Sequence, residues 1–177
     1  IAGCVALTVA YLTQFVSESY KRHRDGSAIA AAIAGELGSY LPAWPMLADM
    51  VRSWVVLVQR GDRAAIPFRP FERPKDMVID EVIAKLGVLG AAHVEEVVSV
   101  YSNIRAFRVG LELILTEHGT MTDAELIDRC HAIQASLDRA ARTGEPLVKR
   151  LRVRADQAFV KPWGRAYLGG TVEVLWT

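Results

Sequence analysis

The longest regular pattern in the chain is a run of apolar residues that recur every three or four positions between residues 91 and 118. Its members are Val94, Val97, Val98, Tyr101, Ile104, Phe107, Leu111, Ile114 and Leu115. This spacing places them on one face of an α-helix about 42 Å long, at about 1.5 Å per residue. Gly90 before the run and Gly119 after it are typical of helix boundaries. Because a helix of this length needs partners along its apolar face, we expect it to form the core of a helical bundle.

Residues 1–16 form a second apolar segment, IAGCVALTVAYLTQFV, which contains no charged side chain. As a helix this segment is about 24 Å long, which is shorter than the roughly 30 Å hydrocarbon core of a membrane. Because the sequence begins at Ile1 rather than at a methionine, we expect further residues upstream and interpret the segment as part of a transmembrane helix. A signal peptide fits less well, since no charged region precedes the apolar run. A core helix buried in a bundle is the remaining alternative.

Basic residues follow the apolar segment directly, at Lys21, Arg22, His23 and Arg24. Basic residues beside a membrane span mark its cytoplasmic end, so we expect the rest of the chain to lie on the cytoplasmic side. Lys21, Arg22 and Arg24 are also expected to contact anionic lipid headgroups.

Two helices are predicted after the basic cluster. The Asp-Gly-Ser sequence at residues 25–27 favours a break with a serine N-cap, after which residues 28–41 are rich in alanine. A single glycine inside a helix destabilises it by only about 1 kcal/mol relative to alanine. A membrane helix that continues without a break to Leu41 is therefore the alternative interpretation. Pro42 ends this element, and the helix expected over residues 42–60 is the second arm of a hairpin with residues 28–41.

A proline-rich strap is predicted over residues 61–74, GDRAAIPFRPFERP. Its prolines favour an extended path with few backbone hydrogen bonds. Phe68 and Phe71 are too apolar to leave in water, so we expect them to hold the strap against the bundle. A proline-rich docking peptide is the alternative interpretation. A short helix follows, and its early acidic residues, Asp76, Asp80 and Glu81, are expected to be solvated, a metal or acid/base site being the alternative.

The C-terminal third begins with a capping box, in which Thr122 precedes Glu125 by three residues. The helix that starts there is expected to end near Gly144, and Pro146 opens a last predicted helix that ends near residue 158. Residues 159–177 are expected to form an irregular or β-like tail.

The same third carries a local excess of positive charge. Between residues 139 and 165 there are eight Lys and Arg residues and two acidic ones, an excess of +6 in a chain whose net charge is +1. Arg150, Arg152 and Arg154 are therefore expected to contact anionic lipid or a protein partner, a solvated helix face being the alternative. Nucleic acid is not an expected partner, because no nucleic-acid-binding module accompanies the charge.

The tail alternates apolar and polar residues in a strand-like way near its end, so that Val172, Val174 and Trp176 share one side. An isolated hairpin is only marginally stable in water. We therefore expect the tail, with Trp163 and Trp176, to contact a partner by strand addition or to cover the chain's own bundle.

The amino-acid composition favours contact between part of the chain and lipid. Hydrophobic residues make up 51% of the chain and the mean hydropathy is +0.19, which is high for a soluble domain. The small net charge excludes a general polycation. Cys4 and Cys130 share no metal-ligand spacing and form no disulfide framework.

The sequence offers one weak hypothesis for a chemical site. It joins Glu117, His118, Cys130 and His131 across the turn at Gly119, although this spacing matches no zinc pattern. No hydrolase, metalloprotease, phosphate-loop or dinucleotide motif is present. We therefore expect no catalytic residue and no cofactor.

Three features taken together resemble a known kind of protein. They are the proline-rich strap, the sequence KLGVLG at residues 85–90, and Val97-Val98-Ser99-Val100-Tyr101 on a long helix. They are similar to uncharacterised proteobacterial proteins that are helical and anchored by a single membrane span. The resemblance covers roughly the first two-thirds of the chain. It implies a bacterial inner-membrane anchor with a cytoplasmic helical domain, and it implies no activity.

The sequence thus predicts an all-α protein with a membrane anchor at residues 1–24, a helical bundle at 25–158 and a tail at 159–177. The expected function is that of a non-catalytic, membrane-tethered interaction protein, meaning an adaptor or an accessory subunit of a larger membrane complex. Its expected partners are other protein subunits and the anionic membrane surface, and self-association is left open. The alternatives are a small membrane-bound enzyme or metal-binding protein, and a soluble helical domain.

Overall fold

A computed structural model describes the backbone of residues 2–69 and 76–159 and the side chains of residues 11–69 and 76–159. The described part contains helices and turns and no strands, which confirms the all-α prediction. Its α-helices are α1 (Ala2–Tyr40), α2 (Ala43–Gln59), α3 (Met77–Val82), α4 (Ala91–Glu117) and α5 (Asp123–Asp156). Its short 3₁₀ helices are η1 (Arg63–Ala65), η2 (Ile83–Leu89) and η3 (His118–Thr120).

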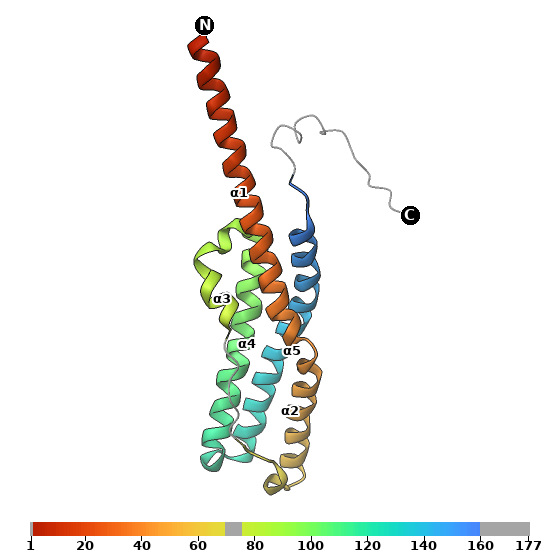
Figure 1. Cartoon of the computed structure of the whole chain (residues 1–177). Coiled ribbons are helices and arrows are strands. Elements are labelled where there is room, and N and C mark those ends of the chain that lie inside the picture. The colour runs from red at the N-terminus through yellow and green to blue at the C-terminus, as the bar shows by residue number, and fades with distance from the viewer. Residues whose placement is uncertain (1, 70–75, 160–177) are drawn as a thin grey trace, which may run out of the picture.

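The centre of the bundle is an antiparallel pair formed by α4 and α5 (Figure 1). The predicted inner face of α4 is confirmed, since Val97, Tyr101, Ile104, Phe107, Leu111 and Ile114 are buried. Val98 is the exception, because Val97 takes the inward position and the next residue of a helix points about 100° away. Thr122 caps α5 as predicted, its hydroxyl accepting a hydrogen bond of 3.2 Å from the Glu125 amide.

α1 and α2 lie one after the other along α5, so the predicted hairpin between them is wrong (Figure 1). The backbone at Pro42 stays in the helical region, with φ −65° and ψ −26°. The chain therefore bends between the two helices instead of reversing. As a result α5 is covered in succession by α1 along its C-terminal part and by α2 along its N-terminal part.

α1 passes through the predicted break at residues 25–27 without interruption. Gly26 is buried at this point, and a Cβ atom added to it would lie 3.1 Å from both the Arg154 guanidinium and the Val88 carbonyl oxygen. Below Gly26, α1 buries Ile29, Ile33 and Leu37 in the core. Toward its N-terminus the helix projects out of the bundle (Figure 1). The change at the predicted domain boundary is therefore one of burial and not of secondary structure.

α5 is one helix, although the sequence predicts two. Pro146 lies inside it and removes one backbone donor, which ordinarily costs about 3 kcal/mol. The residues on either side compensate by packing, because Gly144, Leu147 and Val148 are all buried against neighbouring helices. Tertiary packing here outweighs the local signal for a helix end.

Candidate functional site

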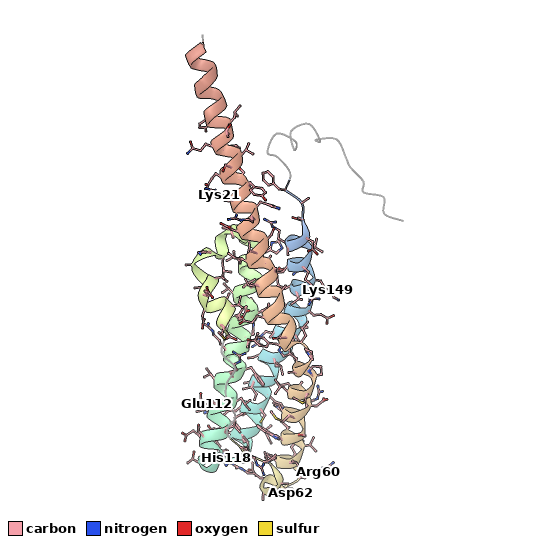
Figure 2. All side chains as sticks on the ribbon, in the orientation of Figure 1. Lys21, Arg60, Asp62, Glu112, His118 and Lys149 are labelled. Carbon is pink, nitrogen blue, oxygen red and sulfur yellow. The ribbon has the colours of Figure 1, made fainter. Side chains whose placement is uncertain are left out.

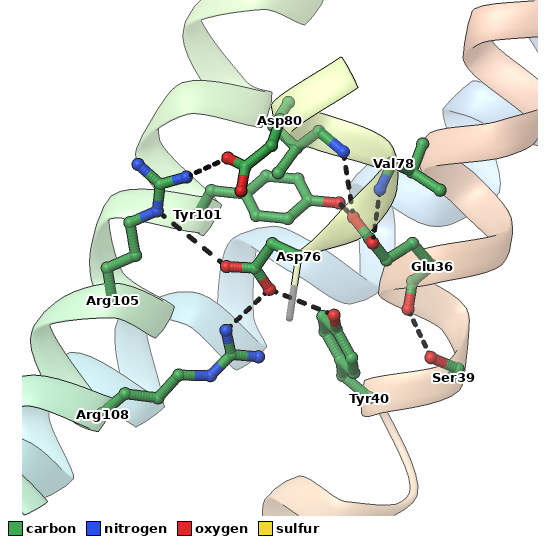
Figure 3. A network of polar contacts seen from close by, with 10 residues as sticks. Glu36, Ser39, Tyr40, Asp76, Val78, Asp80, Tyr101, Arg105 and Arg108 are labelled. Carbon is green, nitrogen blue, oxygen red and sulfur yellow. Dashed lines mark hydrogen bonds and ion pairs between the residues drawn. The ribbon is translucent and has the colours of Figure 1, made fainter. Parts of the chain in front are cut away.

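A network of polar side chains joins α1, α3 and α4 at the middle of the bundle (Figure 3). Glu36 of α1 is one of its two centres. The Glu36 carboxylate accepts hydrogen bonds from the Val78 amide at 2.9 Å, the Ile79 amide at 3.3 Å and the Tyr101 hydroxyl at 2.5 Å. It thereby satisfies two free amides at the start of α3 and ties that helix to both α1 and α4.

Asp76, at the start of α3, is the second centre and is only 6% exposed. Its carboxylate accepts hydrogen bonds from Arg108 at 2.6 Å and from the Tyr40 hydroxyl at 3.1 Å. Arg105 lies 3.9 Å from its other oxygen and pairs with Asp80 at 2.6 Å. The prediction that Asp76 is solvated is therefore wrong, because α1 and α4 converge on the start of α3 and enclose it.

The pKa shifts of Tyr101, Tyr40 and Arg108 keep these three groups in their ordinary protonation states. Burial, followed by the hydrogen bond to Glu36, raises the pKa of Tyr101 well above its usual value. Burial also raises the pKa of Tyr40. Burial acts to lower the pKa of Arg108, but hydrogen bonds to Asp76 and Tyr40 outweigh it, so the pKa is raised. At neutral pH the tyrosines are donors and the arginine is a cation, which suits a structural clamp and not proton transfer.

Only partial signals for this network are visible in the amino-acid sequence. Arg108 lies near the edge of the apolar stripe of α4, where a charged residue needs a partner. Glu36 stands in an alanine-rich, apolar segment. Neither observation identifies the partner, because the contacts between elements join residues that lie 25 to 65 positions apart along the chain.

The predicted basic residues at the start of the bundle lie on its surface, at the end from which α1 projects. Lys21, Arg22 and Arg24 are all exposed. Figure 2 shows Lys21 at this end and Arg60 at the opposite one. Arg22 pairs with Glu18 at 3.3 Å and Arg24 with Asp25 at 3.5 Å. Both pairs are solvent-exposed and therefore contribute little to stability.

The three arginines predicted near the end of α5 separate in space. Arg150 pairs with Glu96 of α4 at 2.7 Å. Arg152 is exposed and lies over Gly38, at the edge of a groove beside α1. Only Arg154 reaches the basic cluster on α1, because it is the one that points toward the start of the bundle. The sequence cluster therefore does not form a single patch.

The proposed metal ligands are not brought together. Cys130 is buried, whereas Glu117 and His131 are exposed. The ring of His118 stacks on Phe68 at 3.9 Å between centroids, and its Nδ1 lies 3.1 Å from the Leu115 carbonyl oxygen. Within the part of the chain that the structure describes, no three His, Cys, Asp or Glu side chains are placed to hold a metal ion.

Phe68 holds the strap against the bundle, as predicted. Its ring lies 5.6 Å from Trp54 and stacks on His118. Phe71, Trp163 and Trp176, the other aromatic residues expected at contacts, lie outside the described residues, as does the predicted strand-like tail.

Two hollows flank Trp44 at the bend between α1 and α2. The larger, of about 590 Å³, is an open groove between the bend and α5. The smaller, of about 130 Å³, lies between the bend and α4. The groove is lined by apolar residues that include Leu41, Pro42 and Val148 and by side chains of both charges. This mixed lining points to no particular class of charged ligand.

Among the residues described, the helical stretch Tyr11–Gln59 is long and apolar enough to cross a membrane. This criterion concerns length and composition, and soluble core helices and signal sequences also meet it. No family model, curated protein or solved structure matches the chain. The function must therefore be argued from the geometry.

Proposed function

We propose that this protein is a membrane-tethered helical interaction protein, in which the projecting part of α1 crosses the membrane and the bundle serves as a rigid platform for other subunits. We place the tether in a bacterial inner membrane and the bundle on its cytoplasmic side. The observation that carries the proposal is the exposed apolar surface of α1 outside the bundle.

The exposure of α1 supports lipid contact over burial in a core. Tyr11 is 71% exposed and Phe15 is 47% exposed, and Leu12 between them is exposed as well. Water would be a poor environment for such a surface, at about 25 cal/mol per Å² of apolar area. A buried core helix, the alternative for residues 1–16, would cover these side chains with the bundle, whereas the first buried residue among the described side chains of α1 is Gly26.

The polar network supports a rigid platform. Because Glu36 and Tyr40 belong to the same unbroken helix as the tether, contacts at α3 and α4 fix the bundle directly to α1. The outer face of α4 carries the exposed apolar residues Val98, Val109 and Leu113, which supports a protein partner there.

Membrane extraction tests the tether. The full chain is expected to stay in the membrane pellet through alkaline carbonate and high salt, and to be released by detergent. The variant Leu12→Arg/Phe15→Arg is expected to shift to the soluble fraction, because each arginine in a span costs up to about 3 kcal/mol. Met46→Arg is the matched control, since Met46 is 66% exposed on α2 and its substitution should leave the chain in the pellet. Release of the unmodified chain by carbonate contradicts the proposal.

Two further measurements test orientation and partners. A fluorescent protein fused after Thr177 is expected to fluoresce, whereas a periplasmic phosphatase in its place is expected to be inactive; the reverse result contradicts the orientation. Chains that copurify from native membranes are expected to be lost with Val109→Glu/Leu113→Glu and retained with Met46→Glu. Recovery of the protein alone, even after crosslinking, contradicts the interaction function.

A further inference from the structure

The open groove beside the bend between α1 and α2 is long and largely apolar. Its α5 side runs from Leu137 to Arg152, a distance of about 22 Å at about 1.5 Å per residue. Leu41, Trp44 and Ala48 form much of the opposite side. A groove of this length and lining suits a short extended segment with apolar side chains better than a compact charged ligand.

The chain itself supplies such a segment after Phe159, the last described residue. Residues 160–177 include two of the four tryptophans of the chain and only three charged side chains. Within them, residues 171–176 read TVEVLW, and every second position from Val172 to Trp176 is apolar. In an extended segment these side chains share one face, which is expected to be covered by other apolar groups.

The length of this part of the chain is sufficient for it to reach the groove. Phe159 follows Val148, which lines the groove, by eleven positions, a distance of about 17 Å along the axis of α5. Residues 160–170 can extend to about 36 Å at about 3.3 Å per residue, which is enough to turn back along α5. Residues 171–176 then cover about 20 Å, which is close to the length of the groove.

Charge is also complementary in this direction. A segment that enters the groove at its Arg152 end brings Glu173, the one acidic residue of 160–177, close to that arginine. Arg152 is exposed and, among the described residues, has no ion-pair partner. Its neighbours Lys149 and Arg150 are each paired with a glutamate. Arg152 is therefore the basic side chain of this stretch that is available to Glu173.

We propose that residues 171–176 of the same chain lie in this groove as an extended segment, with Glu173 paired with Arg152. Trp176 then lies toward the far end of the groove, near Leu137. The same chain is favoured over a second copy, because a linker of about eleven residues gives the segment an effective concentration on the order of 1 mM. The inference does not depend on the proposed function, since the groove is formed by the bundle and not by the projecting part of α1.

Disulfide formation in the full chain in mild detergent tests the position of the segment. Cys4→Ser and Cys130→Ala remove the native thiols, and Asp138→Cys is combined with Thr177→Cys. Asp138 is exposed and lines the far end of the groove. The disulfide is expected to form within one chain at least about tenfold faster than in Ser102→Cys/Thr177→Cys.

Ser102 is a matched control because it is exposed on α4 and does not line the groove. It also lies at the same level of the bundle as Asp138, since the next residue, Asn103, accepts a hydrogen bond of 3.0 Å from Arg139. A difference between the two pairs therefore reports the groove and not the distance along the bundle.

Substitutions in the segment test how it is held. Trp176→Ser is expected to slow the Asp138 disulfide by about fivefold, whereas Trp163→Ser should leave its rate unchanged. Glu173→Lys and Arg152→Glu are each expected to slow it by about twofold, and the two together should restore the rate. If Arg152→Glu unfolds, as judged by near-ultraviolet circular dichroism, then Trp176→Ser and Glu173→Lys decide the matter.

Three results contradict the proposal. Equal rates for the Asp138 and Ser102 pairs show that the segment lies elsewhere. An unchanged rate in Trp176→Ser shows that its apolar face is not what holds it. Disulfides that form only between chains, at a rate that falls on dilution, assign the groove to a second copy instead.

Discussion

The Tyr101 hydroxyl of α4 donates a hydrogen bond of 2.5 Å to the Glu36 carboxylate of α1. This contact joins the helix at the centre of the bundle to the helix that projects from it. The same carboxylate accepts two amides of α3, so one side chain of α1 holds two other elements. Removal of this contact should therefore loosen the bundle and leave the helices themselves intact.

Tyr101→Phe removes one hydrogen bond to a charged acceptor and little volume. We expect it to lower the free energy of unfolding by about 1.5 to 3 kcal/mol, because bonds to charged groups fall in this range. The measurement is urea unfolding of the full chain in detergent at neutral pH, followed by the fluorescence of the buried Trp44 and Trp54. Tyr20→Phe is the control, since Tyr20 is exposed, and it should change stability by less than about 0.5 kcal/mol.

The same substitution should change the response to alkaline pH. The fold raises the pKa of Tyr101 above its ordinary value of 10.0, so the folded chain holds this proton more tightly than the unfolded chain does. Its contribution to stability is complete below about pH 10 and is lost as the pH rises further. Stability of the unmodified chain should therefore fall more steeply above pH 10 than that of Tyr101→Phe. Parallel pH profiles would contradict this assignment.

The pair Asp76–Arg108 should show strong coupling. Both side chains are largely buried, and removal of one leaves the other as an uncompensated charge. We expect Asp76→Leu and Arg108→Met each to destabilise by about 3 to 5 kcal/mol, and the double variant by less than the sum of the two. Urea midpoints for the four proteins of the cycle give the coupling. Additive effects would show that the two charges do not depend on each other in the folded state.

Local patterns predicted where most of the chain is helical, but they did not predict every helix boundary or how the helices are arranged. The spacing of Val97, Ile104 and Leu111 predicts the buried face of α4, and the capping box predicts the start of α5. Pro42 and Pro146 signal boundaries in the same local way. At Pro42 the backbone stays in the helical region and the chain only bends, and at Pro146 the helix α5 continues without a break.

The polar network was not predicted, because its meaning depends on residues that meet only in the folded chain. Asp76 follows a proline-rich segment and precedes a short helix, where an acidic residue is ordinarily solvated. Its burial depends on Tyr40 and Arg108, which come from two other helices. The basic residues of α5 show the opposite case, in which residues that are close in sequence lie apart in the structure. Successive positions of a helix point in different directions, so the neighbours differ for Arg150, Arg152 and Arg154.

Glycines at helix contacts should be intolerant of a methyl group. A Cβ atom at Gly144 would lie 2.5 Å from Cη2 of Trp44, a rigid ring that is itself buried. We expect Gly144→Ala to destabilise by about 1 to 3 kcal/mol. Gly35→Ala is the matched control on α1, where no heavy atom lies within 4 Å, and it should be neutral or stabilising by up to about 1 kcal/mol. Equal urea midpoints for the two variants would show that α2 and α5 are not in close contact at Trp44.

The Cys130 thiol should be unreactive in the folded chain. It is fully buried, and burial raises its pKa from 9.0 to about 11. Because the thiolate is the reactive form, about one thiol in a hundred is ionised at pH 9 even where reagent can reach it. In a Cys4→Ser background, an aromatic disulfide reagent should react with Cys130 slowly in detergent and at once after unfolding in urea. The raised pKa also stabilises the fold, because the folded chain holds the thiol proton of Cys130 more tightly than the unfolded chain does. This contribution is lost as the pH rises from about 9 to 11, so the free energy of unfolding of Cys130→Ala should depend less on pH in that range. Rapid modification of the folded chain at pH 8 would place the thiol at the surface and contradict the packing of α5 against α4.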